Sequence, residues 1–249
     1  MSIPELEFRR RFQPDYSGMR LEELSFCTME NFSGVTEEYR LDLIRSEVPA
    51  STHQPVVFFI HGGGFVKPND KRQAYISMFA KELTKAGYAV ISPDYPQFEN
   101  EEHRAAAGGV TAAYAKAAEA VHYAYQFVQE HATQWNLDPT RIAIMGGSAG
   151  GIASFYAISN YSDAYCAFIN CWGAPEIIPD VSHFPATLSV HGTEDPLVPY
   201  LLEEAVQAAF EEYTIFHKLI TLPGCGHTPL NKFAEFMPDI IEWLNTYLK

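Results

Sequence analysis

Residues 141–151 read Arg-Ile-Ala-Ile-Met-Gly-Gly-Ser-Ala-Gly-Gly, and this stretch decides the fold. Residues 142–145 are apolar and predict a short buried strand, and the residues after the stretch predict the start of a helix. Between them lies the pattern Gly146-x-Ser148-x-Gly150. A serine at such a junction is expected on a strained turn that lifts its hydroxyl clear of the sheet. Both glycines lack a Cβ, so strand and helix can approach each other closely.

Serine is a weak nucleophile at neutral pH, so chemistry at Ser148 needs three further parts. These are a base that accepts its proton, a carboxylate that orients the base, and N–H donors for the oxyanion that forms. The N-terminus of the helix that follows Ser148 favours negative charge beside it. The remaining parts must come from segments that the same fold brings to this serine.

The composition indicates a globular protein and excludes some partners. The chain has 249 residues and a net charge of −14, from 31 acidic and 17 basic residues. This charge disfavours nucleic acids and anionic membrane surfaces. No apolar run approaches the length of a transmembrane helix, and residues 1–11 contain no apolar core of a secretory signal. We therefore expect a cytoplasmic protein without membrane or nucleic-acid partners.

The four cysteines fit a reducing compartment. Cys166 and Cys171 lie five positions apart on a predicted strand and would face opposite sides of it, so they are not expected to pair. We interpret all four cysteines as free thiols.

Strands and helices alternate along most of the chain. Residues 24–30 and 38–46 predict a hairpin around the turn 31–34, and residues 1–22 and 97–109 are expected to be irregular. Further strands are predicted at 56–60, 89–92, 142–145, 164–171, 186–190 and 218–222. Helices are predicted from a cap at Asn69 or Asp70 to Ala86, then at 110–133, from the elbow to 159, at 201–212 and at 233–248. This order predicts a mostly parallel sheet with helices on both faces.

The candidate base and acid follow the last predicted strands. His227 lies in a loop between glycines, and Asp195 lies in the segment His-Gly-Thr-Glu-Asp-Pro that begins at residue 191. Carboxyl ends of parallel strands meet at one edge of a sheet, so both side chains are expected near Ser148. His227 could instead be a surface histidine, Asp195 a helix cap, and Glu194 the acid. The chain order Ser, Asp, His favours Asp195 as the acid.

The candidate oxyanion loop is His61-Gly-Gly-Gly64, directly after a buried strand. Successive glycines let N–H groups turn inward without a Cβ in the way. We expect donors from Gly63, Gly64 and Ala149, the alternative for the loop being an ordinary tight turn.

No motif for a cofactor or a metal is found. The glycines form neither a dinucleotide fingerprint nor a P-loop, and Cys225 and His227 lack zinc ligands at suitable spacing. The candidates for a substrate-binding wall are His61, Phe65, Tyr95 and Trp172, although core packing is the simpler account of the three aromatic residues.

Together, the segments His61–Phe65, Asp94-Tyr95, 146–151, 191–199 and Gly226-His227 resemble the α/β-hydrolase family, in its hormone-sensitive-lipase-like and acetyl-esterase branch. The resemblance covers nearly the whole chain. It implies one domain over residues 1–249, with an eight-stranded, mostly parallel sheet and no cofactor. It also implies a triad of Ser148, His227 and Asp195, and an oxyanion hole from Gly63, Gly64 and Ala149.

The sequence departs from that branch in two places. Pro96-Gln97-Phe98-Glu99 replaces the usual Arg-Leu-Ala-Pro-Glu after Asp-Tyr, and the segments that form a cap in relatives are short. The chain is therefore more similar to small bacterial esterases that act on acetylated sugars or short acyl esters than to lipases.

Several alternatives stay open from the sequence. A peptidase, an amidase or an acyltransferase would use the same triad, and a non-catalytic binding protein could keep the same scaffold. A homodimer through edge strands or the terminal helix is compatible with the sequence, but no feature demands it. Residues 1–22, 96–109 and 173–185 would shape the pocket, and their irregularity leaves the acyl and alcohol preferences undefined.

Overall fold

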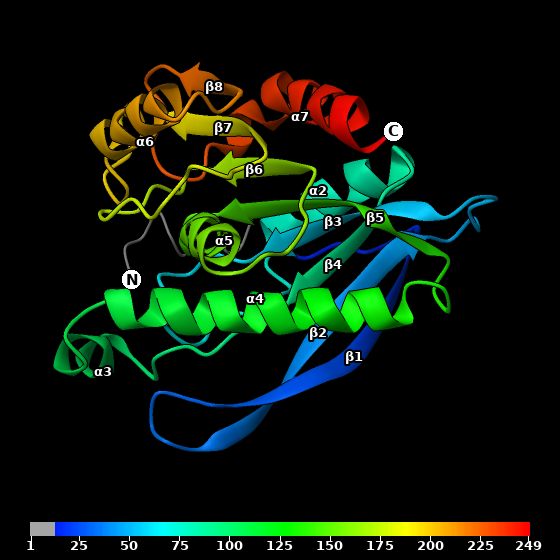
Figure 1. The fold of residues 1–249 in the computed structure, drawn as a ribbon, viewed down its shortest axis with the longest axis horizontal. Helices are drawn as coiled ribbons and strands as arrows, with labels where there is room; N and C mark the ends of the chain where they lie inside the picture. The colour runs from blue at the N-terminus through cyan, green and yellow to red at the C-terminus, as the bar shows by residue number, and fades with distance from the viewer. Residues whose placement is uncertain (1–12) are drawn as a thin grey trace.

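An eight-stranded sheet runs through residues 13–249, the part of the chain that the computed structural model describes (Figure 1). Its order is β1-β2-β4-β3-β5-β6-β7-β8, and only β2 runs antiparallel to its neighbours. The strands are β1 (Met19–Glu30), β2 (Thr36–Ser46), β3 (Gln54–Ile60), β4 (Ala89–Pro93), β5 (Leu137–Gly147), β6 (Ala167–Cys171), β7 (Ala186–Gly192) and β8 (His217–Leu222). The predicted mostly parallel, eight-stranded sheet is confirmed.

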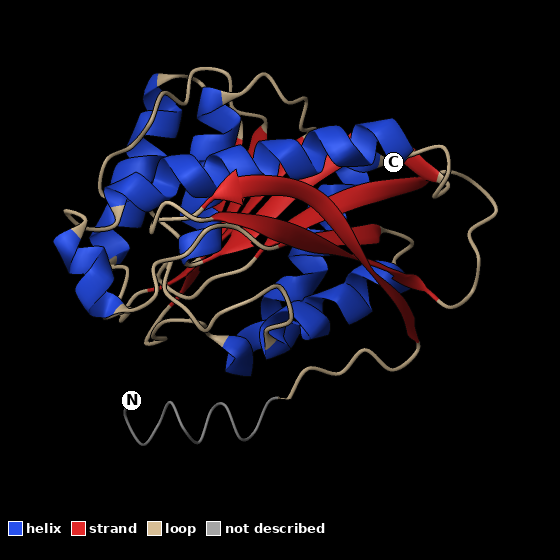
Figure 2. Cartoon of the chain, turned by 90° about the horizontal axis from the view of Figure 1, so that it is seen from below, coloured by secondary structure: helices blue, strands red, loops and turns tan. Residues whose placement is uncertain are grey.

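Helices cover both faces of this sheet, as Figure 2 shows. The helices are α2 (Ala74–Lys85), α3 (Glu101–Ala106), α4 (Thr111–His131), α5 (Ala149–Asn160), α6 (Tyr200–Glu212), the 3-10 turn η1 (Leu230–Lys232) and α7 (Phe233–Leu248). Residues of α4, α5 and α6 belong to the core on one face, and residues of α2 and α7 belong to the core on the other.

The strand β3 shows how the sequence builds both cores at once. Val56, Phe58 and Ile60 pack into the core with α4 and α5, whereas Val57 and Phe59 pack into the core with α2 and α7. All five side chains are fully buried. Because successive side chains of a strand point to opposite faces, a strand covered on both sides must be apolar throughout.

The first strand begins earlier than predicted. β1 starts at Met19, inside the segment 1–22 that we expected to be irregular, and Met19 pairs with Ser46 of β2. The strand lies at the edge of the sheet and is buried only in part. Because it carries charged residues at several positions, it lacks the regular alternation of apolar and polar residues that would predict a strand. Residues 1–12 of that segment lie outside the described residues.

The predicted cap of the next helix is wrong. α2 begins at Ala74, and neither Asn69 nor Asp70 caps it. Asn69 donates to the Gly63 and Val66 carbonyls at 3.2 and 2.6 Å, and Asp70 accepts from the Arg72 N–H at 2.8 Å. These polar side chains stabilise the loop before the helix, which is a frequent alternative to capping.

The acidic segment 97–109 also differs from expectation, because it contains helix α3. The Asn100 side chain accepts from the His103 N–H at 2.8 Å and caps the helix. Glu101 and Glu102 lie in the first turn, where negative charge is favourable. A turn this short gives too little periodicity for a sequence-based prediction. Residues 172–185, by contrast, contain no helix or strand, as predicted.

The elbow between β5 and α5 depends on glycine at two positions. A Cβ on Gly150 would overlap the Ile60 carbonyl oxygen and lie 2.6 Å from the His61 carbonyl oxygen. A Cβ on Gly146 would overlap the carbonyl group of Gly150. The first turn of α5 therefore packs directly against the end of β3 and the backbone of β5.

We expect Gly150→Ala to destabilise the protein by about 3 kcal/mol, because backbone atoms must move to admit the methyl group. For a chain of this size, the melting temperature should fall by about 6–12 °C. Gly226→Ala is the control, since the nearest atom to its added Cβ would be 3.7 Å away, and its melting temperature should change by less than about 2 °C. Equal melting temperatures for the two variants would contradict this packing.

Candidate active site

Ser148 sits on the strained turn that the sequence predicts. It follows β5, precedes the first residue of α5, and has φ 55° and ψ −123°, a conformation that costs a non-glycine residue about 1–3 kcal/mol. Its N–H donates to the Cys171 carbonyl at 2.9 Å, which ties the turn to the end of β6. Packing on both sides maintains this strained conformation, which presents the Ser148 hydroxyl at the carboxyl edge of the sheet.

Three segments far apart in sequence bring their side chains together at this edge. His227 Nε2 lies 2.9 Å from Ser148 Oγ, and His227 Nδ1 lies 2.7 Å from Asp195 Oδ2. A carboxylate only accepts hydrogen bonds, so Nδ1 is the donor to Asp195. The other ring nitrogen then presents its lone pair to the serine hydroxyl. This arrangement allows His227 to accept the serine proton.

Asp195 is held in place by hydrogen bonds from the loop that carries it. Its Oδ1 accepts from the N–H groups of Leu197 at 2.8 Å and Val198 at 3.0 Å, while Oδ2 faces His227. Burial by itself raises the pKa of Asp195, but the hydrogen bonds from His191, His227 and Val198 N–H outweigh it and hold that pKa well below its usual range. Glu194, the rival acid, is exposed.

The candidate oxyanion loop lies beside the serine. A Cβ on Gly62 would be 3.2 Å from Ser148 Cβ, and Gly63 and Gly64 have φ of 114° and 63°. These positive φ values turn the peptide planes in a way that L-residues rarely adopt. Within residues 13–249, neither the Gly63 N–H nor the Gly64 N–H donates a hydrogen bond to the protein. Ala149, the third predicted donor, is the first residue of α5, so its N–H lies in the first turn of that helix.

Side chains that sequence reasoning missed fix the shape of this loop. Tyr75 Oη accepts from the Gly62 N–H at 2.7 Å, and Gln73 Nε2 donates to the Gly62 carbonyl at 3.1 Å. Arg104 of α3 donates to the Gly64 carbonyl at 3.0 Å. Asn69 completes the set through the Gly63 carbonyl and its bond to Gln73. No motif announces them, because each contact joins positions with no fixed spacing.

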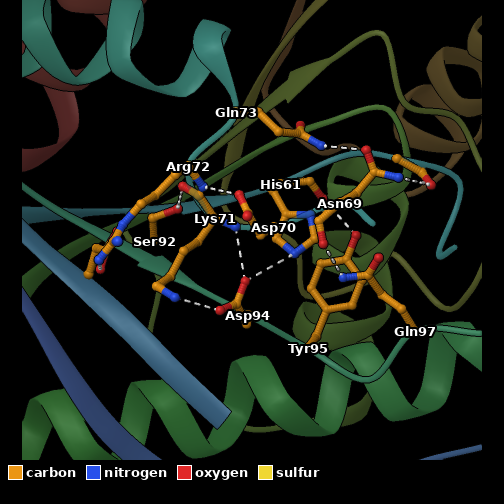
Figure 3. A network of polar contacts seen from close by, with 12 residues as sticks. His61, Asn69, Asp70, Lys71, Arg72, Gln73, Ser92, Asp94, Tyr95 and Gln97 are labelled. Atoms are coloured by element: carbon orange, nitrogen blue, oxygen red, sulfur yellow. Dashed lines mark hydrogen bonds and ion pairs between the residues drawn. The ribbon is translucent and has the colours of Figure 1, made fainter. Parts of the chain in front are cut away.

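A second polar network supports the loop from the side of β4 (Figure 3). Asp94 accepts from the Lys71 N–H at 2.9 Å and from Lys71 Nζ at 2.6 Å, and His61 Nε2 lies 3.8 Å from Asp94 Oδ1. Tyr95 Oη donates to the His61 carbonyl at 2.7 Å, and the two rings stack at 4.2 Å. Burial lowers the pKa of His61 and keeps its ring neutral. The segment Asp94-Tyr95 thus holds the first residue of the candidate oxyanion loop.

The four residues predicted as a substrate-binding wall are buried instead. His61 is fully covered, and Phe65, Tyr95 and Trp172 are each 1% exposed. Phe65 packs against Tyr95, and Trp172 packs against Tyr75. Covered side chains of this kind support the loops around the serine and offer no surface to a substrate, so we replace the substrate-binding interpretation with a structural one.

The described residues contain no cluster of metal ligands and no disulfide. Within residues 13–249, no three of the His, Cys, Asp and Glu side chains are placed to hold a metal ion. None of the described helices is both long and apolar enough to cross a membrane. All four cysteines lie in this part of the chain and are free thiols.

Comparison with known families identifies the chain. A family model, BD-FAE, matches residues 41–169, a range that includes the candidate oxyanion loop and the elbow with Ser148. The chain belongs to the BD-FAE family. A search of curated proteins found no match.

Solved structures similar to this BD-FAE chain share its fold. A truncated carbohydrate esterase from gut microbiota is 16% identical, with a TM-score of 0.70 over 94% of this chain and 99% of that one. A thermostable esterase from Pseudomonas putida is 16% identical, with a TM-score of 0.73 over 98% and 88%. MGS-M1, an α/β-hydrolase from a deep-sea metagenome library, is 17% identical, with a TM-score of 0.71 over 93% and 98%. The BD-FAE chain therefore has the α/β-hydrolase fold that the resemblance implies.

The support of the oxyanion loop by Tyr75 leads to a prediction. Tyr75→Phe leaves the buried Gly62 N–H without an acceptor, which should cost about 1–3 kcal/mol and reduce kcat for p-nitrophenyl acetate about 10-fold as the loop relaxes.

Tyr88→Phe is the matched control, because it removes a hydrogen bond from a tyrosine to Asn245. Tyr88 directly precedes the first residue of β4, at the end of the strand away from Asp94. The substitution should lower the melting temperature but keep the kcat of the folded protein. A Tyr75→Phe variant with unchanged kcat would show that the loop does not depend on this contact.

Proposed function

We propose that the chain is a serine hydrolase that cleaves short-chain carboxylic esters through an acyl-enzyme intermediate. One observation carries the proposal: the hydrogen-bonded row of Ser148, His227 and Asp195, with contacts of 2.9 and 2.7 Å. Such a row supplies a nucleophile, its base and the group that orients the base.

In the proposed reaction, Ser148 Oγ attacks the acyl carbon while His227 Nε2 takes the hydroxyl proton. Asp195 stabilises the imidazolium that forms. The oxyanion is bound by N–H groups of Gly63, Gly64 and Ala149, each of which lowers the barrier by roughly 3 kcal/mol. His227 then protonates the departing alcohol, and the acyl group stays on Ser148.

Water completes the cycle by the same chemistry. His227, again neutral, removes a proton from a water molecule, which attacks the acyl-enzyme through a second tetrahedral intermediate. His227 returns the proton to Ser148 Oγ as the carbon–oxygen bond breaks, and the carboxylic acid leaves.

The segments around the serine favour substrates with small acyl groups, from acetyl to butyryl. Residues 172–185 form no helix, so no helical lid follows β6, and α3 is the only regular element between β4 and α4 in the described chain. The structural similarity to a carbohydrate esterase supports acetylated sugars as a substrate class. The similarity to solved esterase structures favours esters over the amide substrates of a peptidase.

A panel of substrates tests this proposal. Purified protein should hydrolyse p-nitrophenyl acetate and butyrate faster than the octanoate, and should release acetate from acetylated xylose or glucose. Ser148→Ala should reduce kcat/KM by at least about 10⁴-fold. Ser159→Ala, near the end of α5, serves as the control and should keep the wild-type rate.

The outcomes separate the alternatives. Faster cleavage of p-nitroacetanilide than of the acetate ester would indicate an amidase, and acyl transfer to added alcohols in preference to water would indicate an acyltransferase. Wild-type protein that neither turns over esters nor reacts with a fluorophosphonate probe would indicate a binding protein. Any of these results would contradict the esterase proposal.

Two further properties stay predictions from the sequence. We propose that the protein is cytoplasmic, where it would act on small-molecule esters. The homodimer predicted through an edge strand or α7 can be tested by light scattering. A monomer at all concentrations would leave the chemistry at Ser148 unchanged, since all three side chains come from one chain.

A further inference from the structure

A buried polar cluster lies next to Asp195, and the proposed reaction does not use it. His191 belongs to the end of β7, Glu203 to the first turn of α6, and Asn170 to β6. All three residues are fully buried. Polar groups this deep in a protein need partners, so their contacts indicate what holds the cluster together.

His191 makes contacts through both ring nitrogens. Its Nε2 lies 2.9 Å from the Val198 carbonyl oxygen and 3.3 Å from Asp195 Oδ2. Because a carbonyl oxygen only accepts, Nε2 carries a proton. Its Nδ1 lies 3.5 Å from Glu203 Oε2 and has no hydrogen-bond partner in the part of the chain that the structure describes.

The contacts of Glu203 favour a proton on the other ring nitrogen as well. Asn170 Nδ2 donates to Glu203 Oε2 at 3.0 Å, and Gln207 Nε2 donates to Glu203 Oε1 at 2.6 Å. Both oxygens therefore accept hydrogen bonds, which suits the ionised carboxylate. A neutral His191 would direct the lone pair of Nδ1 at this carboxylate, whereas a proton on Nδ1 turns the repulsion into attraction.

The charges of the cluster lead to the same conclusion. The side chains of Asp195 and Glu203 are both fully buried, and two buried carboxylates without a cation are strongly unfavourable. The titratable groups that face His191 are Asp195, Glu203 and Tyr200, with His227 beyond Asp195. Burial by itself lowers the pKa of His191, but Asp195 and Glu203 outweigh it and raise that pKa to about 9.

We propose that His191 is a positioning residue: a buried imidazolium, held between Asp195 and Glu203, that fixes the Asp195 carboxylate in the orientation in which it accepts from His227. Its function in catalysis rests on the proposed hydrolase activity. Glu203 supplies the second negative charge that keeps His191 protonated, and Asn170 and Gln207 keep Glu203 in place.

This arrangement has a consequence for the reaction. Asp195 Oδ2 is shared between two imidazole rings, at 2.7 Å from His227 and 3.3 Å from His191. The fixed charge on His191 offsets part of the attraction between Asp195 and a proton on the neighbouring ring. Removing the charge on His191 should therefore move the acid limb of the pH–rate profile to higher pH.

The protonation of His191 can be measured without any substrate. In protein with ¹⁵N-labelled histidine, NMR should show both ring nitrogens of His191 protonated at pH 7, with the proton lost near pH 9. His191→Gln assigns the signal by its disappearance. In Glu203→Gln, the same proton should be lost below pH 7. A neutral His191 at pH 6 in the wild-type protein would overturn the proposal, whether or not the chain proves to be an esterase.

Stability gives a second readout with a defined sign. A group whose pKa rises from the ordinary 6.5 to about 9 on folding stabilises the protein fully below pH 6.5, and this contribution is lost as the pH rises through 9. The melting temperature of the wild type should therefore fall between pH 6.5 and 9, relative to that of His191→Gln. A constant difference across this range would contradict a charged His191.

Kinetics tests the positioning role. In His191→Gln, kcat/KM at pH 7 should fall on the order of 10-fold, and the acid limb of its pH profile should move to higher pH. Glu203→Gln should lower kcat/KM similarly, and the double variant should be no worse than either single one. His217→Gln, a half-buried histidine on β8, is the control and should match the wild type.

A merely structural role predicts a different result. It would lower the melting temperature of His191→Gln without moving the acid limb, and the two substitutions would add; either finding overturns the proposal. If His191→Gln does not fold, the NMR measurement on wild-type protein and Glu203→Gln decides the question.

Discussion

The close packing of Gly150 against the end of β3 is the constraint on which the rest of the structure depends. It brings the first turn of α5 onto the backbone of Ile60 and His61, where no side chain would fit. Ser148 is thereby forced into its strained conformation, and the glycine loop that follows β3 is placed beside it. One backbone contact thus positions the proposed nucleophile and the glycine loop that is proposed to bind the oxyanion.

Buried and partly buried carboxylates organise the same edge of the sheet. Arg72 contacts Asp42 through two nitrogens, at 2.7 and 2.8 Å, and Lys71 contacts Asp94 at 2.6 Å. His191 lies against Asp195 in the corresponding way. The chain has 17 basic residues against 31 acidic ones. The basic side chains that lie next to buried carboxylates therefore indicate where negative charge must be neutralised for the fold to form.

Local patterns in the sequence predicted a large part of this molecule. The G-x-S-x-G elbow, the apolar strands and the chain order of Ser148, Asp195 and His227 follow from spacing and periodicity, and the structure brings these three side chains together. The short helix α3 and the early start of β1 were missed because their periodicity is weak.

The supporting contacts could not be predicted in the same way. Arg104 contacts Gly64 across 40 positions in the chain, and His191 meets Glu203 only because α6 folds back onto β7. Such pairs depend on how elements pack, and no spacing rule encodes them. The aromatic residues near the serine could have been core or pocket wall in sequence, and burial decides for the core.

The central claim is that Ser148 becomes covalently acylated, and mass spectrometry after rapid acid quenching tests it most directly. Protein mixed with p-nitrophenyl acetate should gain the mass of one acetyl group, and this mass should map to the peptide that contains Ser148. Acetylation confined to other residues, or turnover of the ester without any acyl-protein at the earliest times, would contradict the account.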